Sequence, residues 1–154
     1  IGRKLQLKSG RTLRFIPTPF SHSAGSFMTY DEKSGILFSS DIFGAYANQG
    51  KERALFAELP DVCHSCRDAG MGQDGYICAS AAAPCPISPM FRWHREMMTS
   101  NKALRYSLKA TEATAPGMLA PQHGHVLTRE KDIRLITRRL MELDDVGIDG
   151  VAYA

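Results

Sequence analysis

The stretch TPFSHSAGSFMTYDEKSGILFSSD, residues 18–41, contains two short apolar runs joined by a polar turn. Phe27–Tyr30 has the aromatic and β-branched content of a strand, and Ile36–Phe38 is a continuous apolar run, as expected of a strand buried on both faces. The polar residues between them end in glycine, which indicates a hairpin. Because the outer ends of a hairpin meet, His22 and Asp41 should lie at one edge of a sheet. That pairing suits a metal ion better than a core.

A third candidate ligand, His123, lies in the later segment LAPQHGH, residues 119–125. Its apolar start and its proline are typical of a buried strand that runs into a loop, where the glycine allows a sharp turn. Loops at strand ends commonly carry binding and catalytic groups. We therefore expect His22, Asp41 and His123 to converge. His125 is then a neighbour that either supports a ligand or faces solvent.

These residues resemble the C-terminal half of a metallo-β-lactamase-fold domain, in the diiron branch that contains flavodiiron and oxygen-binding diiron proteins. The matching segments are Thr18–His22, Gly25–Ser26, Ser40–Asp41, Pro121–Gly124 and Phe91–Tyr106, the last being similar to the helix before the final metal-binding loop. The resemblance covers most of the chain outside roughly residues 51–89. It implies an α/β (α+β) fold, half of an αββα sandwich, with mostly antiparallel strands and two or three helices.

The resemblance also implies a site for two iron ions that bind O2, for reduction or for sensing. Asp41 would be the carboxylate that bridges the two metals, with His22 on one iron and His123 on the other. Imidazole and carboxylate ligands suit zinc or manganese equally well. The alternative enzyme is therefore a zinc hydrolase of the same superfamily, which would cut thioesters, esters or phosphodiesters with a metal-bound hydroxide.

The remaining ligands of such a site are expected outside this sequence. Family members carry an earlier His-x-[His/Glu]-x-Asp-His motif, and residues 1–154 contain none. We expect a single partial domain that alone binds metal weakly or not at all, because metal sites usually use three or four protein ligands. Its partner would be the missing N-terminal half, or a second copy in a homodimer that covers the open face and edge of the sheet.

Residues 61–89 are a cysteine-rich insertion that contains all four cysteines of the chain, Cys63, Cys66, Cys78 and Cys85. The Cys-x-x-Cys spacing of the first two is that of two thiolates on one ion. The others could complete a structural zinc or iron–sulfur site, with His64 as a substitute ligand. Buried thiols and disulfides are the alternatives. A redox- or metal-sensing module is the non-enzymatic hypothesis for this segment.

Composition excludes several classes of protein. The 154 residues are 44% hydrophobic with a net charge of +3, which is ordinary for one globular domain. No apolar run approaches the roughly 20 residues that span a membrane, and there is no signal-peptide pattern, so a cytoplasmic protein is expected. The basic residues near the N-terminus lack interleaved aromatics, which argues against nucleic-acid binding. No flavin or dinucleotide fingerprint is present, so any flavin or electron donor would come from another domain or protein.

The remaining pattern predicts a second hairpin and three further helical regions. The hairpin joins Arg3–Lys8 to Arg11–Ile16 through a Ser-Gly turn. A short helix is predicted for Lys51–Leu59. The longest helical stretch spans Met90–Ala115, with a Ser-Asn pair that interrupts it and can cap a second helix. The last helix is predicted to start with Thr128 as its N-cap.

Overall fold

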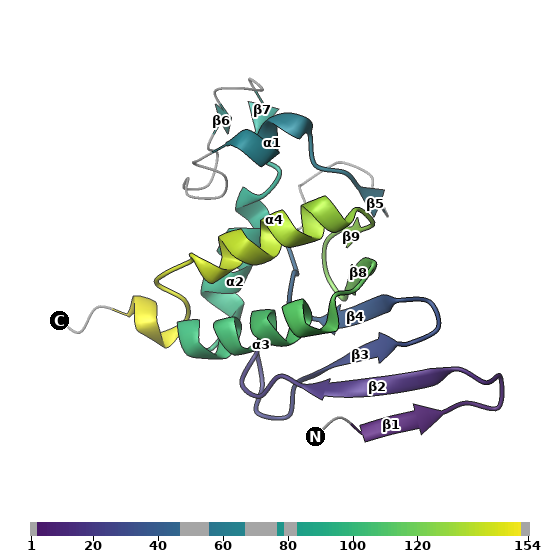
Figure 1. Cartoon of the computed structure of the whole chain (residues 1–154). Helices are drawn as coiled ribbons and strands as arrows, with labels where there is room; N and C mark the ends of the chain where they lie inside the picture. Colours follow the sequence, from purple (N-terminus) through teal and green to yellow (C-terminus); the bar gives the residue numbers. More distant parts are fainter. Residues whose placement is uncertain (1–2, 47–55, 67–76, 79–82, 152–154) are drawn as a thin grey trace.

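The computed structural model describes residues 3–46, 56–66, 77–78 and 83–151. The strands in these ranges are β1 Arg3–Gln6, β2 Thr12–Pro17, β3 Phe27–Asp31, β4 Ile36–Ser40, β5 Phe56–Ala57, β6 Ile77–Cys78, β7 Ala83–Pro84, β8 Met118–Pro121 and β9 Val126–Leu127. Seven of them form one sheet in the order β1-β2-β3-β4-β8-β9-β5, and β6 pairs with β7 separately (Figure 1).

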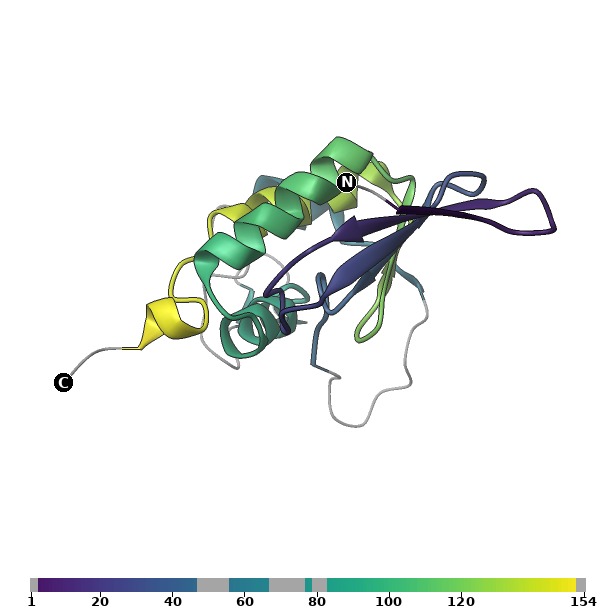
Figure 2. The ribbon, with the colours of Figure 1, turned by 90° about the horizontal axis from the view of Figure 1, so that it is seen from below.

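The helices of the described residues are α1 Asp61–Ser65, α2 Ser88–Met97, α3 Asn101–Thr114 and α4 Glu130–Met141, followed by a 3-10 turn, η1 Ile148–Gly150. Helices α3 and α4 pack against each other and lie over one face of the sheet (Figure 2). In the described part of the chain, no helix is both long enough and apolar enough to cross a membrane.

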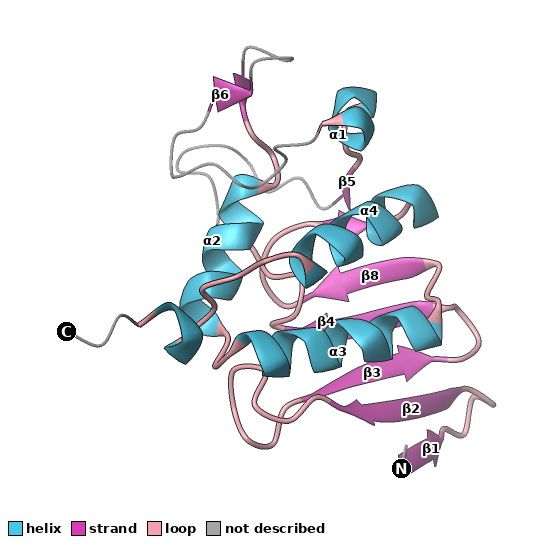
Figure 3. Ribbon diagram, turned by 60° about the vertical axis from the view of Figure 1, so that its left-hand side comes forward, coloured by secondary structure: helices cyan, strands magenta, loops and turns pink. Residues whose placement is uncertain are grey.

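Strand pairing confirms the expected α/β (α+β) class with mostly antiparallel strands. Strands β1 to β4 form an antiparallel meander, and β8 is antiparallel to β9. The predicted hairpins are both present, and the central one pairs Thr29 with Phe38. Two pairs are parallel, β4 with β8 and β5 with β9. Figure 3 shows β8 next to β4 in the sheet.

The parallel pair β4–β8 determines where the loops meet. Its register places Leu37 opposite Leu119 and Ser40 opposite Pro121. Both strands therefore end at the same edge of the sheet, and the Gln122 backbone N–H donates to the Ser40 carbonyl over 2.8 Å. The loops after β4 and β8 begin side by side as a result.

The core lies between the sheet and its two helices. Met28 on β3, Leu37 on β4 and Leu119 on β8 are fully buried. They belong to one cluster with residues of α3 and α4, including Leu104, Leu108, Ile133, Ile136 and Leu140. The prediction that Ile36–Phe38 is buried on both faces is wrong, because Phe38 points away from the helices and is 48% exposed. Side chains alternate across a strand, so one face of this strand is open.

Several helix boundaries differ from those predicted. The break at Ser100 is confirmed, since its hydroxyl accepts the Ala103 N–H and caps α3. Thr128 is not the cap of α4, whose N-cap residue is Arg129. Of the helix predicted for Lys51–Leu59, residues 51–55 lie outside the described ranges, and the part at 56–57 is wrong because β5 forms there.

Candidate metal centre

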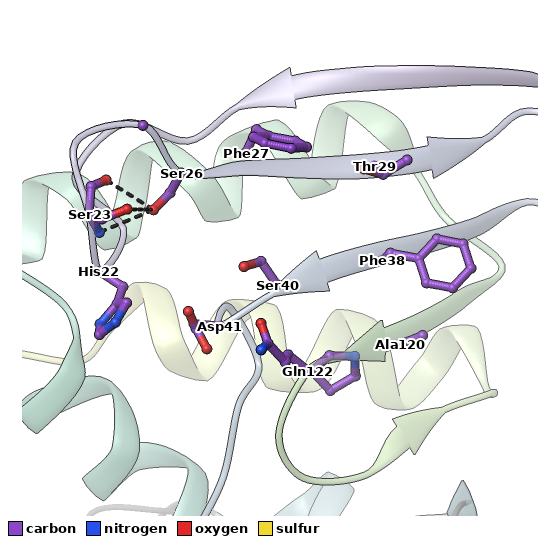
Figure 4. Close-up of a pocket in the computed structure, with 12 residues that line it drawn as sticks. His22, Ser23, Ser26, Phe27, Thr29, Phe38, Ser40, Asp41, Ala120 and Gln122 are labelled. Atoms are coloured by element: carbon purple, nitrogen blue, oxygen red, sulfur yellow. Dashed lines mark hydrogen bonds between the residues drawn. The ribbon is translucent and has the colours of Figure 1, made fainter. Parts of the chain in front are cut away.

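Three loops bring the predicted ligands to one edge of the sheet. Asp41 follows β4, His123 lies in the β8–β9 loop, and His22 lies in the β2–β3 loop. A cavity of about 680 Å³ opens here between the strand ends (Figure 4). His22 and Asp41 both line it, together with Ser40 and Gln122.

Asp41 and His123 lie near enough to share a ligand. The His123 Nε2 lies 3.6 Å from the Asp41 Oδ1. That distance is too long for a hydrogen bond, but two ligands that each lie about 2.1 Å from one metal ion can be up to roughly 4.2 Å apart. The Asp41 side chain is largely buried and the His123 side chain is half exposed. The donor types and the spacing therefore fit a metal ion between them.

His22 is oriented by its own backbone and by helix α2. Its φ of 84° is in the left-handed region, and its Nδ1 lies 3.3 Å from the Met97 carbonyl oxygen. A carbonyl only accepts, so this contact requires the proton on Nδ1. The lone pair of Nε2 then remains for a ligand, as is usual for histidines in metal sites. His22 lines the cavity that Asp41 also lines.

Backbone strain is concentrated around these loops. Among the described non-glycine residues with positive φ, four flank the cavity or its loops: Phe20, His22, Ser40 and Phe43. Each such conformation costs on the order of 1–3 kcal/mol, which packing elsewhere must offset. Strain of this kind is typical of binding and catalytic sites.

The described residues contain no group of three or more His, Cys, Asp and Glu side chains that could hold a metal ion. The structure thus brings Asp41 within 3.6 Å of His123, and His22 and Asp41 line the same cavity. His125, predicted to be a supporting or solvent-facing residue, is half-buried just before β9.

The three cysteines whose side chains are described form no metal-binding group with other His, Cys, Asp or Glu residues of the described ranges. Cys63 and Cys85 are buried in the hydrophobic core and Cys66 packs against it, while the side chain of Cys78 lies outside the described residues. His64, the predicted substitute ligand, has its Nε2 2.8 Å from the Oδ1 of Asp132 on α4. This histidine therefore serves a different contact.

Trp93 and Gln122 contribute to the site but are not singled out by sequence reasoning. The Trp93 ring lies over that of His123, with centroids 4.8 Å apart, and Gln122 lines the cavity. Trp93 sits in an amphipathic helix, where an aromatic residue is ordinarily core. The only sequence signal for Gln122 is its position next to His123, because the neighbours of a ligand in the same loop also lie near the site.

The fold and the site define a metallo-β-lactamase-like domain with candidate metal ligands at the strand ends. Residues 1–124 match the family described as "ODP family beta lactamase", and the chain belongs to that family.

Solved structures agree with this assignment. A structure described as "Peroxy diiron species of chemotaxis sensor ODP" is 28% identical, with a TM-score of 0.70 over 97% of this chain and 52% of that one. The flavodiiron core of a Synechocystis sp. PCC6803 protein is 23% identical, with a TM-score of 0.64 over 91% of this chain and 28% of that one, and shows likeness of fold.

A curated relative matches a shorter segment. A protein of Nostoc sp. (strain PCC 7120) named for a diflavin flavoprotein is 40% identical over 45 residues, which are 29% of this chain and 8% of that protein. The chain thus spans about half the length of the ODP structure and a small part of the diflavin protein.

Proposed function

We propose that this chain supplies His22, Asp41 and His123 to a dinuclear iron site that binds O2. The observation that supports it most directly is the 3.6 Å between the Asp41 carboxylate and the His123 imidazole at the adjoining ends of β4 and β8. Membership of the ODP family and the diiron state of its solved relative agree with iron as the metal.

Each residue has a distinct part in this proposal. The carboxylate of Asp41 has two oxygens and can bridge two ions, which places negative charge between them. The imidazoles of His22 and His123 would each hold one ion. Two irons held there would supply the redox chemistry that O2 binding needs. The chain's own contribution is to hold these three side chains in place and to surround them with an apolar wall.

The cavity lining suits a small apolar ligand. Phe27, Phe38, Ala120 and Pro121 line it beside the polar groups at its edge. Apolar walls with a few convergent polar groups are the usual composition of a ligand site. Oxygen is small and uncharged, so it enters such a cavity without losing strong contacts to water.

We further propose that another polypeptide layer completes the site. The sheet face opposite α3 and α4 presents Phe27 and Phe38 to solvent, each about half exposed. Polypeptide outside residues 1–154, or a second copy of the chain, would cover this face and add metal ligands. Reduction of O2 would also need electrons from a separate flavin domain or donor protein, whereas sensing would need only binding.

Anaerobic titration with Fe(II) tests the proposed site. The chain is expected to bind iron weakly, with Asp41→Asn and His123→Ala each weakening binding at least tenfold. Asp144→Asn is the matched control, since Asp144 is exposed and pairs with Arg105, and it should bind like the wild type. Equal affinity in Asp41→Asn and the wild type would overturn the assignment. Selective binding of zinc with esterase turnover would favour the hydrolase instead.

A further inference from the structure

Two adjacent residues of α2 bind the backbone that follows the candidate ligand Asp41. The Trp93 indole N–H donates to the Asp41 carbonyl over 3.1 Å, and the Phe43 N–H donates to the His94 Nε2 over 3.0 Å. Trp93 is 7% exposed and His94 is fully buried. Helix α2 therefore holds both ends of the segment 41–43.

The hydrogen bonds of His94 define its tautomer. Its Nδ1 lies 2.7 Å from the Met90 carbonyl oxygen, so Nδ1 carries the proton. Its Nε2 must then be unprotonated to accept the Phe43 N–H. Burial lowers the pKa of His94 to about 4, which keeps the ring neutral at pH 7. Both ring nitrogens are thus used on backbone groups of two different elements.

Trp93 also contacts the second ligand loop. Its ring lies 4.8 Å from that of His123 at an interplanar angle of 40°. The Ala45 N–H donates to the His123 carbonyl, which joins the two loops directly. Gly44 leaves room for the indole, because a Cβ there would lie 2.4 Å from the Trp93 Nε1. The indole is therefore enclosed by the loops that carry Asp41 and His123.

We infer that Trp93 and His94 are a positioning pair that sets the direction of the Asp41 carboxylate relative to the His123 imidazole. The pair acts through the backbone of residues 41–43, where Phe43 has a φ of 67°. Without an acceptor at position 94, the Phe43 N–H would be buried without a hydrogen-bond partner. The positive-φ conformation of Phe43 would then lose the side-chain hydrogen bond that stabilises it. The expected effect on metal binding rests on the proposed function, whereas the expected effect on the backbone of residues 41–43 does not.

A metal-free measurement tests the backbone part. His94→Leu and His94→Gln both remove the imidazole, but the glutamine Oε1 can accept the Phe43 N–H in its place. In amide hydrogen exchange followed by NMR, His94→Leu should lose protection at Phe43 by at least tenfold, while His94→Gln retains most of it. Amides of α3 and α4 report whether the fold is kept. Unchanged Phe43 protection in His94→Leu would overturn the inference.

Iron titration of the same variants tests the consequence for the site. Substitution of residues that orient metal ligands typically lowers metal affinity by roughly 10–100-fold. His94→Leu should therefore bind Fe(II) at least tenfold more weakly, with His94→Gln largely restored. Trp93→Phe keeps an aromatic ring over His123 but loses the N–H to Asp41, and it should weaken binding without unfolding. Wild-type affinity in both His94→Leu and Trp93→Phe would contradict the inference. If the wild-type chain alone binds no Fe(II), the proposed weak binding by this chain fails, and the exchange measurement still decides the positioning role.

Discussion

At the scale of single residues, His94 makes the stability of the fold depend on pH. Its pKa is about 4 in the folded chain because of burial, and 6.5 is its ordinary value. Below pH 6.5, His94 is protonated in the unfolded chain but stays neutral in the folded chain. The contribution of His94 to the free energy of unfolding is therefore complete above pH 6.5 and decreases as the pH falls toward 4. A shift of this size corresponds to about 3 kcal/mol in total, and about 2 kcal/mol is lost by pH 5.

Urea unfolding of the wild type and His94→Gln at pH 7 and pH 5 checks this expectation. Glutamine does not titrate, so the free energy of unfolding of His94→Gln should fall about 2 kcal/mol less than that of the wild type between the two pH values. Carboxylates with lowered pKa values, such as Asp31, contribute equally to both proteins. Parallel losses of stability in the two proteins would show that His94 already takes up its proton in the folded state.

The absence of a side chain at Gly44 is a second residue-scale requirement. An alanine Cβ would lie 2.4 Å from the Trp93 Nε1 and 2.9 Å from the Asp41 carbonyl. Neither neighbour can move without breaking their hydrogen bond, so Gly44→Ala should lower the free energy of unfolding by about 1–3 kcal/mol. It should also change the near-ultraviolet circular dichroism of Trp93, the single tryptophan.

Gly25→Ala is the matched control for this change. Gly25 lies in the His22 loop, and a Cβ there meets no atom within 4 Å. Its stability should stay within about 0.5 kcal/mol of the wild type, as for most surface substitutions. Equal stability of Gly44→Ala and Gly25→Ala would mean that the indole tolerates displacement.

Residue types at strand ends were enough to place Asp41 and His123 at one edge of the sheet. A hairpin sends its strands out and back, and a histidine next to glycine after an apolar strand indicates a loop. The supporting pair Trp93-His94 could not be assigned, since its role depends on contacts across about fifty positions of sequence, to Asp41 and Phe43. Positive φ at His22 was also beyond prediction, because local sequence disfavours it and the surrounding structure imposes it.

At the scale of elements, Asp132 on α4 fixes the segment that leads into α1. It is fully buried and accepts hydrogen bonds from Arg129, His64 and the Leu59 N–H. Burial alone would raise the pKa of Asp132, but the hydrogen bond from Arg129, with those from Leu59 and His64, holds it below the ordinary value. The carboxylate is thus charged and satisfied, and it connects helices that are far apart in sequence.

Asp132→Ala should therefore cost about 1–3 kcal/mol, because it leaves the buried Leu59 N–H without its acceptor, while Arg129 keeps Glu58 and the Leu59 carbonyl as partners. Asp61→Asn is the control, since Asp61 is exposed and pairs with Lys131 at the surface. Exposed pairs contribute about 0–1 kcal/mol, so this variant should unfold almost like the wild type. Both are measured by urea unfolding, and a similar small loss in both would show that α1 is held mainly by apolar contacts.

Element prediction succeeded where the signal was local. The Ser100 cap and both hairpins depend on residues close in sequence. The β5 strand at 56–57 was missed because it is two residues long and forms only by pairing with β9. Thr128 was a plausible cap by residue type, but the Arg129–Asp132 ion pair sets the start of α4 one residue later. Long-range pairing therefore decided these elements.

At the scale of the whole molecule, the sheet is covered on one face only within the described residues. Helices α3 and α4 bury Leu37 and Leu119, while Phe27 and Phe38 lie on the other face with Thr29 and Ala120 around the cavity. We propose one explanation for two features, the half-exposed Phe27 and Phe38 and a candidate site to which three ligands are assigned. A second layer that packs on this face would bury the aromatics and bring further ligands to Asp41 and His123.

In a solution of this chain alone, we propose that a second copy of the chain packs on this face. Sedimentation velocity at micromolar concentration should then show a dimer, because paired burial of Phe27 and Phe38 removes apolar surface from water. Phe27→Ser/Phe38→Ser should shift the chain to monomer. Tyr106→Ser removes an equally exposed aromatic from α3, away from this face, and should leave the dimer intact. A wild-type monomer would reject self-pairing, whereas a dimer that persists in the double variant would place the contact on another surface.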